Sequence, residues 1–387
     1  MLKRGTHLSA AFVCLVVAAV NLAGIQRGLA FPLEGAFLSR TSNLLGGKGI
    51  HSRFENPTRS TRSINPWPRH NTSFYLSRSY SQESKGGNGA AKGSQAAAKV
   101  RNQQIIALGR DRDWKGILAL YHEQSKDFNS VNLATTMSQL GRIQSVNKRD
   151  PSFAKFVDDL ANIIEARGLQ WIGIREVANI VHVVGKMQLK SKSAQQIIEF
   201  AARKENAKAI VMRGEPQHVA NICWAMAKLG RSDIFPSFMG ILEDRSQWLV
   251  KEGTPQNVAN TAWACATFGI QSPKLFSEIE KHSSWIVMEG NPQEVANTAW
   301  ACATLGIQSP KLFSEIEKQS SWLVKEGRPQ AVANIAWACA TLGIQSPKLL
   351  SKIEKNSSWI LKEGNPQNIA NTAWACATLG IQSPKLF

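Results

Sequence analysis

The chain has 387 residues, of which 43% are hydrophobic, so it is too long for the smallest single-domain classes and can bury a sizeable core. Its formal net charge is +18, but residues 1–100 hold 13 Lys/Arg against only 3 Asp/Glu. Residues 101–253 hold 22 against 16, and residues 254–387 hold 11 against 9. Residues 101–387 are therefore only mildly basic, which permits a polyanionic partner without requiring one.

Residues 1–30 predict a signal peptide. Basic residues precede the apolar run Leu8–Val20, which is too short for a comfortable membrane span, and Gly28 and Ala30 suit a cleavage site. A signal anchor is the alternative. After cleavage we expect no stable membrane insertion.

Residues 31–83 are basic, rich in Ser, Asn and Thr, and poor in acids, which is typical of a transit peptide. With Phe31 at its start, this arrangement resembles the two-part plastid presequence of algae with red-lineage plastids. The resemblance implies a plastid location, with the mitochondrion as the alternative. Residues 84–111, which begin with the low-complexity stretch Ser84–Lys99, predict a flexible linker.

From residue 112 to 387 the sequence repeats itself. Trp224, Trp263, Trp300, Trp337 and Trp374 follow one another at intervals of 39, 37, 37 and 37 residues. An Asn three positions earlier marks seven units, the first two of which lack the Trp: Asn132, Asn179, Asn221, Asn260, Asn297, Asn334 and Asn371. A period near forty predicts a solenoid.

Each unit contains signals for two helices. Ser309 and Pro310 suit the start of a first helix, which we expect to run to Glu326. Gly327 is expected to end it in the left-handed conformation, and a second helix is expected to run from Pro329 to Gly343. The predicted fold class is therefore all-α, an αα-superhelix of helix-hairpin repeats.

On a helical wheel, the second helix has an apolar stripe that includes Val295, Ala299, Cys302 and Trp300. We expect this stripe, Trp included, to pack against neighbouring units. Base stacking by the Trp is the alternative, and it needs an exposed ring. The other side, with Asn297 and Thr304 around Ala301, is expected to be open to a ligand.

Cysteine recurs at one repeat position, in Cys265, Cys302, Cys339 and Cys376, with Cys223 close to the matching place. Stacked helices lie about 8–10 Å apart, which is too far for a disulfide, so we expect buried thiols. The sequence has no CxxC or HxxxH pair, so it predicts no metal site.

The nearly identical units differ at few places, and these are the candidate base-reading positions, because a modular reader needs a constant scaffold with variable polar side chains. They are Asn257, Glu294, Ala331 and Asn368; Asn291, Arg328 and Asn365; and His282, Gln319 and Asn356. A fourth place holds Thr298, Ile335 and Thr372. Drift at exposed positions would produce the same pattern.

The repeated Asn has two interpretations. In one, Asn221, Asn260, Asn297, Asn334 and Asn371 form a structural ladder that satisfies neighbouring backbone groups. In the other, they contact a ligand. The sequence has no nucleophile elbow, phosphate loop or dinucleotide turn, so we expect no enzyme activity and no cofactor. The Glu and Lys residues of the EIEK segments are expected on a solvated helix face.

The stretches GEPQHVANICWAMAKLG and NPQEVANTAWACATLG resemble the second helix of octotricopeptide repeats, with Pro-Gln ahead of a Trp-Ala-x-Ala-x-Leu-Gly run. The resemblance covers roughly residues 112–387, although Phe276, Phe313 and Leu350 stand near the family's Trp in the first turn. The family, like the related FAST-kinase-like repeat proteins, is implicated in RNA binding in chloroplasts and mitochondria. The resemblance implies single-stranded organellar RNA as the partner, with other RNA-processing proteins as further partners.

Two other functions stay open. A protein-binding scaffold of armadillo or TPR type is also a helical solenoid, although the Asn lies on the other side of the Trp there. An RNA-processing enzyme would need a catalytic domain beyond this chain. The repeat stops at Phe387 without a polar capping unit, so we expect a fragment of a longer protein.

Overall fold

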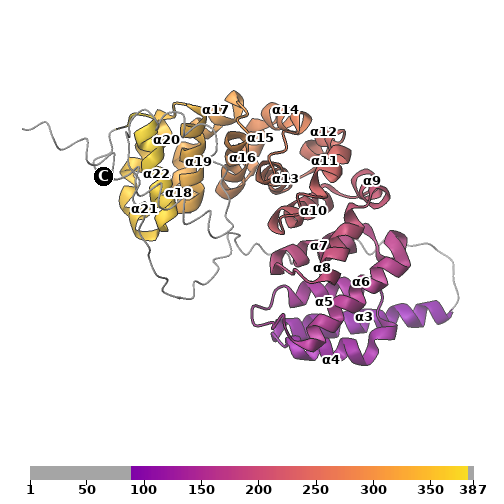
Figure 1. Ribbon diagram of the computed structural model, residues 1–387. Coiled ribbons are helices and arrows are strands. Elements are labelled where there is room, and N and C mark those ends of the chain that lie inside the picture. Colours follow the sequence, from indigo (N-terminus) through magenta and orange to yellow (C-terminus); the bar gives the residue numbers. More distant parts are fainter. Residues whose placement is uncertain (1–88, 382–387) are drawn as a thin grey trace, which may run out of the picture. The chain divides into compact units, whose positions relative to one another are not determined.

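The computed structural model describes residues 89–381, and the predicted signal peptide, transit peptide and start of the linker lie outside this range. The residues from Ala98 onward belong to one compact unit. The described part is all α-helical and contains no strand, which confirms the predicted solenoid class (Figure 1). No described helix is long and apolar enough to span a bilayer.

Seven B helices, one in each repeat unit, carry the repeated Asn. They are α5 (Ser130–Leu140), α7 (Ile174–Met187), α10 (Pro216–Lys228), α13 (Pro255–Thr267), α16 (Pro292–Thr304), α19 (Pro329–Leu342) and α22 (Pro366–Thr378). Each of these helices packs against the B helix before it and the B helix after it (Figure 1). The B helices therefore form one continuous layer.

The second layer consists of the segments that precede each B helix. In the last four units an A segment is followed by a shorter A′ segment: α11 (Phe235–Glu243) and α12 (Ser246–Glu252), α14 (Pro273–Lys281) and α15 (Ser283–Glu289), α17 (Pro310–Lys318) and α18 (Ser320–Glu326), and α20 (Pro347–Lys355) and α21 (Ser357–Glu363). The earlier units have α4 (Trp114–Gln124), α6 (Pro151–Ile172, bent at Gly168), and α8 (Lys192–Ala202) with α9 (Lys204–Arg213).

The prediction of one unbroken first helix to Glu326 is wrong, because the helix breaks at Gln319, whose ψ is 11°. At the equivalent break in the preceding unit, a serine hydroxyl bonds back into the helix. There the buried Ser283 hydroxyl donates to the carbonyl oxygens of Ile279 (3.0 Å) and Glu280 (2.9 Å). A Ser hydroxyl that bonds back to the preceding turn bends a helix. Ser320 is likewise buried and begins α18.

The glycine that ends the A′ segment does not take the left-handed conformation predicted for it. Gly327 has φ −73° and ψ 153°, so the chain leaves the helix in extended form. A Cβ at this position would lie 2.3 Å from the Leu323 carbonyl oxygen and 3.4 Å from the Pro292 Cβ of the preceding unit. Glycine is therefore required for space. Gly343, at the end of α19, does have a left-handed φ of 70°.

A carboxylate at the end of α11, α14 and α17 caps the start of the following unit. Glu280 accepts hydrogen bonds from the Ser309 hydroxyl (2.5 Å) and from the Lys311 backbone amide (2.9 Å). Glu317 repeats the contact with the Lys348 amide at 2.7 Å. These carboxylates satisfy donors at the start of a helix, where no intrahelical partner exists. The expectation of a solvated face for this Glu is therefore wrong.

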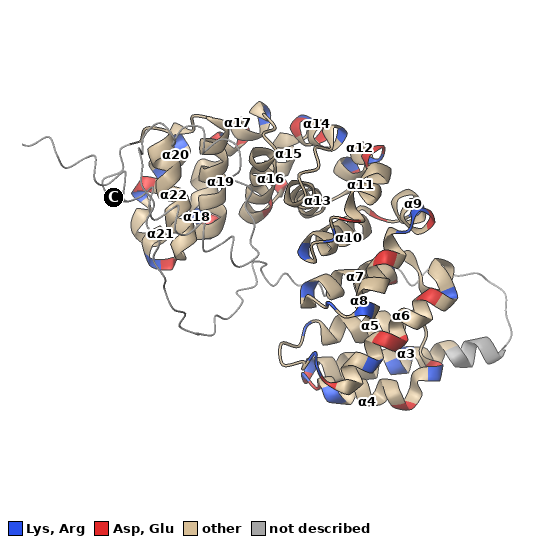
Figure 2. Ribbon diagram, in the orientation of Figure 1, with Lys and Arg blue, Asp and Glu red and all other residues tan. Residues whose placement is uncertain are grey.

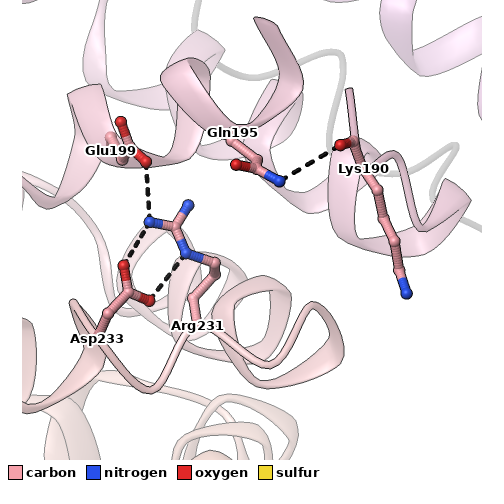
Figure 3. Close-up of polar contacts among 5 residues, drawn as sticks. All are labelled: Lys190, Gln195, Glu199, Arg231 and Asp233. Atoms are coloured by element: carbon pink, nitrogen blue, oxygen red, sulfur yellow. Dashed lines mark hydrogen bonds and ion pairs between the residues drawn. The ribbon is translucent and has the colours of Figure 1, made fainter. Parts of the chain in front are cut away.

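An ion cluster joins α8 to the loop between α10 and α11 (Figure 3). Arg231 Nη2 donates to Glu199 Oε1 at 2.9 Å and to Asp233 Oδ2 at 2.6 Å, and its Nε donates to Asp233 Oδ1 at 2.9 Å. The hydrogen bonds from Arg231 hold the pKa of Asp233 below its usual value. The cluster fixes the position where the irregular early units meet the regular ones.

The segment predicted as a linker contains α3 (Gly89–Arg110). Its Ile105 is buried, and Asn132 of the first B helix donates to the Ala98 carbonyl oxygen at 3.0 Å. The same Ala- and Gln-rich composition that suggested low complexity also has high helix propensity. This helix covers the side of the first B helix that no earlier unit covers.

Candidate functional site

Several partly exposed positions of the later B helices form one narrow line. In α16, Gln293, Trp300 and Thr304 are partly exposed, and Asn297 lies between them with 6% of its surface exposed. At 100° per residue these four positions fall within an arc of about 60°. Most of the other residues of α16 are buried, because neighbouring B helices cover both of its sides.

We call the repeated line the ladder, and it runs across five successive B helices. It consists of Gln217, Asn221, Trp224 and Lys228 in α10; Gln256, Asn260, Trp263 and Thr267 in α13; Gln293, Asn297, Trp300 and Thr304 in α16; Gln330, Asn334, Trp337 and Thr341 in α19; and Gln367, Asn371, Trp374 and Thr378 in α22.

The predicted split of the B helix into a packed stripe and an open face is wrong at two positions. Ala301, which belongs to the predicted open side, is completely buried. The Trp residues, which were expected in the core, are partly exposed in α13, α16, α19 and α22, and only Trp224 is buried. A wheel drawn for one packing face cannot show this, because the B helix has neighbours on two sides.

The Asn of the ladder bonds within its own helix in the clearest case. Gln293 Nε2 donates to Asn297 Oδ1 at 2.9 Å. The Oδ1 atom of Asn260 is buried and has no hydrogen-bond partner in the part of the chain that the structure describes. The same is true of the Thr304 hydroxyl. Buried polar atoms are normally paired, so these two atoms are exceptions among the described residues.

Aromatic rings and cations stack along the early part of the ladder. The His182 ring of α7 lies 4.9 Å from the Trp224 ring. Lys228 Nζ lies 5.8 Å from the Trp224 ring centre and 5.6 Å from that of Trp263 in the next unit. These distances are typical of cation–π contacts, and burial lowers the pKa of Lys228. The ammonium group therefore bridges two repeats.

Two of the candidate base-reading positions are partners in one helix cap. Glu294 Oε2 accepts from the Asn291 backbone amide at 3.0 Å, and Asn291 Oδ1 accepts from the Glu294 amide at 3.1 Å. Asn365 and Asn368 form the same reciprocal pair, with distances of 3.2 and 2.9 Å. Asn257 forms it with Thr254, which occupies the matching place in the preceding unit.

The other residues at these variable positions are also explained by helix capping and packing. Arg328, at the start of α19, makes no side-chain cap, and its partner position is the buried Ala331. At the fourth variable place, the Thr298 hydroxyl donates to the Glu294 carbonyl oxygen at 2.9 Å within the core. Variation at these positions therefore follows helix capping and packing.

The third set of candidates lies elsewhere. His282, Gln319 and Asn356 occupy the junctions between A and A′ segments, outside the B layer. His282 Nδ1 lies 2.9 Å from the Glu278 carbonyl oxygen, Asn356 Nδ2 donates to the Lys352 carbonyl at 2.8 Å, and Gln319 contacts Met288 Sδ at 3.3 Å. The structure does not bring this set to the ladder.

The repeated cysteines are buried thiols, as predicted for the described chain. Cys223, Cys265, Cys302, Cys339 and Cys376 are all unbridged. Burial raises the pKa of Cys302 to about 12 and that of Cys339 to about 11. The described residues contain no cluster of His, Cys, Asp and Glu that could hold a metal ion.

The fold defines an α-helical repeat solenoid whose B layer carries a ladder of amide and indole side chains. No family model and no curated protein matches this chain.

The sequence interpretation placed Gln293, Asn297 and Thr304 on the open side of the B helix but missed the Trp positions of the ladder. The signal that could have found them is the spacing Gln-x3-Asn-x2-Trp-x3-Thr, which recurs in the four most regular units. Residues at i, i+4, i+7 and i+11 share one helix face, so a polar and aromatic set at this spacing marks the single side left free in a packed layer.

Proposed function

We propose that the chain is a single-stranded RNA-binding repeat protein that binds through the ladder of the B helices. The observation that carries this proposal is the row of partly exposed Trp rings next to amide side chains, one set in each of α13, α16, α19 and α22. Bases of a single strand stack on aromatic rings, and amides bond to their edges.

The proposal agrees with the resemblance of the B-helix sequences to octotricopeptide repeats. On that basis the chain would act without catalysis in the stability, processing or translation of organellar transcripts, together with other RNA-processing proteins. The leader sequence supports a plastid, with the mitochondrion as the alternative. The candidate positions Asn291, Glu294, Arg328 and Ala331 would then influence binding through the start of each B helix.

A protein-binding scaffold is the second candidate, and one observation favours it. The division of each late unit into A, A′ and B segments gives it three helical pieces, as in arrays of the HEAT and armadillo class. A peptide partner would pack against aromatic side chains with little dependence on salt. Salt dependence therefore separates the two candidates.

The test is a fluorescence titration of the purified chain with single-stranded RNA, single-stranded DNA of the same sequence and duplex RNA, each at several salt concentrations. The proposal predicts tight binding to a subset of RNA single strands, with affinity that falls as salt rises. Equal, weak binding of all polyanions, or no binding at all, would reject it and turn the search to protein partners.

A further inference from the structure

Exposed cations lie in two neighbouring turns at the C-terminal ends of the first two B helices. Three are in the turn after α5, and two are at the end of α7 and in the turn that follows it (Figure 2). All five side chains belong to exposed residues. We call this set the basic edge, and it consists of Arg142, Lys148, Arg149, Lys186 and Lys190.

Direct contacts hold the two turns together. The Lys148 ammonium donates to the carbonyl oxygen of Met187, the last residue of α7, at 2.6 Å. Gly141, the first residue of the turn after α5, lies so close to α7 that a Cβ on it would be 2.4 Å from Val183 Cγ1. The turn after α5 therefore lies against the last part of α7, and the cations of both turns share one edge of the B layer.

Carboxylates do not neutralise the basic edge. Asp150, the acid in the turn after α5, accepts hydrogen bonds from the amide and the hydroxyl of Ser152, at 2.9 and 2.5 Å. Figure 3 shows the Lys190 side chain extending away from the carboxylates of Glu199 and Asp233. Among the described residues, four members of the edge have no carboxylate partner: Lys148, Arg149, Lys186 and Lys190.

The fold itself does not require these cations. Cations at the C-terminal end of a helix can offset its dipole and bind its last carbonyl oxygens. In α7, the Gly185 and Val184 carbonyl oxygens already accept from the backbone amides of Gln188 and Leu189, both at 3.1 Å. The matching turns of later units contain no Lys or Arg, in residues 268–272, 305–309 and 343–346. Because those helices end without a cation, the basic edge points to a ligand.

We propose that the basic edge binds the phosphate backbone of the RNA strand where the strand extends past α10 toward the first units. This proposal rests on the proposed function. The first ladder helix, α10, contacts α7 through the Trp224 and His182 rings, whose centres are 4.9 Å apart. Lys186 lies one helical turn after His182, so the basic edge adjoins the ladder. Phosphate contacts carry no base information, so the edge adds affinity while the ladder provides selectivity.

The test removes three charges from the basic edge in the whole chain. Lys148 is kept, because its hydrogen bond to α7 holds the two turns together. The edge variant combines three substitutions: Arg149→Gln, Lys186→Gln and Lys190→Gln. The matched control has the same net charge and changes three exposed lysines of the second layer: Lys251→Gln, Lys311→Gln and Lys362→Gln.

RNA titrations at several salt concentrations give the slope of log K against log salt for each protein. With about 0.7 for each phosphate contact on a single strand, the slope of the edge variant should be smaller in magnitude by about 2. The ranking of RNA sequences should stay as in the wild type, and the control should keep the wild-type slope. Equal slopes in the edge variant and the control would overturn the proposal.

Titration with long-chain inorganic polyphosphate separates this proposal from the proposed function, because polyphosphate has phosphates and no bases. We expect the wild type and the control to bind polyphosphate with equal affinity and the edge variant to bind it more weakly. That result supports the basic edge even where the ladder binds no RNA. A wild type that does not bind polyphosphate, or equal binding by the two variants, overturns the edge and leaves the ladder to its own test.

Discussion

Asn291 and Glu294 cap the same helix reciprocally, each accepting a hydrogen bond from the backbone amide of the other at 3.1 and 3.0 Å. Asn291→Ala should lower the free energy of unfolding by about 1 kcal/mol, as loss of an N-terminal cap does. Arg328→Ala is the control, because Arg328 holds the same place in the next unit without a side-chain cap. Denaturation followed by circular dichroism measures both, and equal losses would contradict the capping role.

The contact between Glu280 and the next unit gives a second prediction. Glu280→Ala leaves the buried Ser309 hydroxyl and the Lys311 amide without their acceptor, so the free energy of unfolding should fall by about 1–2 kcal/mol. Glu326→Ala removes a carboxylate that makes only an exposed pair with Lys325, 3.5 Å away, and should change stability by under about 0.5 kcal/mol. Similar losses of stability in the two variants would contradict the capping role of Glu280.

Two glycines should respond differently to the same substitution. In Gly327→Ala the new Cβ meets the Leu323 carbonyl oxygen at 2.3 Å, so the chain has to move and stability should fall by at least about 2 kcal/mol. In Gly306→Ala the Cβ meets nothing within 4 Å, and only the left-handed φ of 67° is unfavourable, which costs about 1 kcal/mol. Thermal unfolding compares them, and a smaller loss for Gly327→Ala would be inconsistent with the close approach.

Stability should depend on pH through His182. Burial, aided by the charge of Lys186, lowers the pKa of His182 to about 4. The unfolded state binds this proton near pH 6.5 and the folded state only near pH 4, so stability is full above pH 6.5 and falls as pH drops toward 4. The loss should be on the order of 1–3 kcal/mol.

The variant His182→Gln removes this titration and should make the fall in stability between pH 6.5 and 4 shallower. His282→Gln is its control, since Gln319 occupies the matching position of the next unit. Unfolding curves recorded at several pH values test the pair. If stability of His182→Gln falls with pH as steeply as that of the wild type, the titrating group is not His182.

The regular features of the fold could be predicted from the sequence because they depend on local signals. The interval between Trp263 and Trp300, the Pro at the start of each of the last five B helices and Gly343 at the end of α19 correctly placed these B helices. Capping and turn residues act within a few positions of themselves, so their meaning does not depend on the rest of the chain.

The features that sequence reasoning missed depend on neighbours in space. The break at Gln319 comes directly before the buried Ser320, although a Ser-Ser pair resembles an exposed stretch. The burial of Ala301 and the partial exposure of Trp300 follow from the two flanking B helices. A helical wheel of a single helix does not show these neighbours. The variation of Asn291 and Glu294 was interpreted as base reading because their pairing was not visible.

The most direct test of the ladder is a comparison of two pairs of tryptophans. Trp300→Leu with Trp337→Leu removes partly exposed rings from the B layer, and Trp285→Leu with Trp322→Leu removes partly exposed rings from the A′ segments. With stacking contributing about 1–3 kcal/mol per base, the B-layer pair should weaken single-stranded RNA binding at least tenfold, and the A′ pair should leave it unchanged. Equal affinities of both double variants, or a larger loss in the A′ pair, would contradict the account.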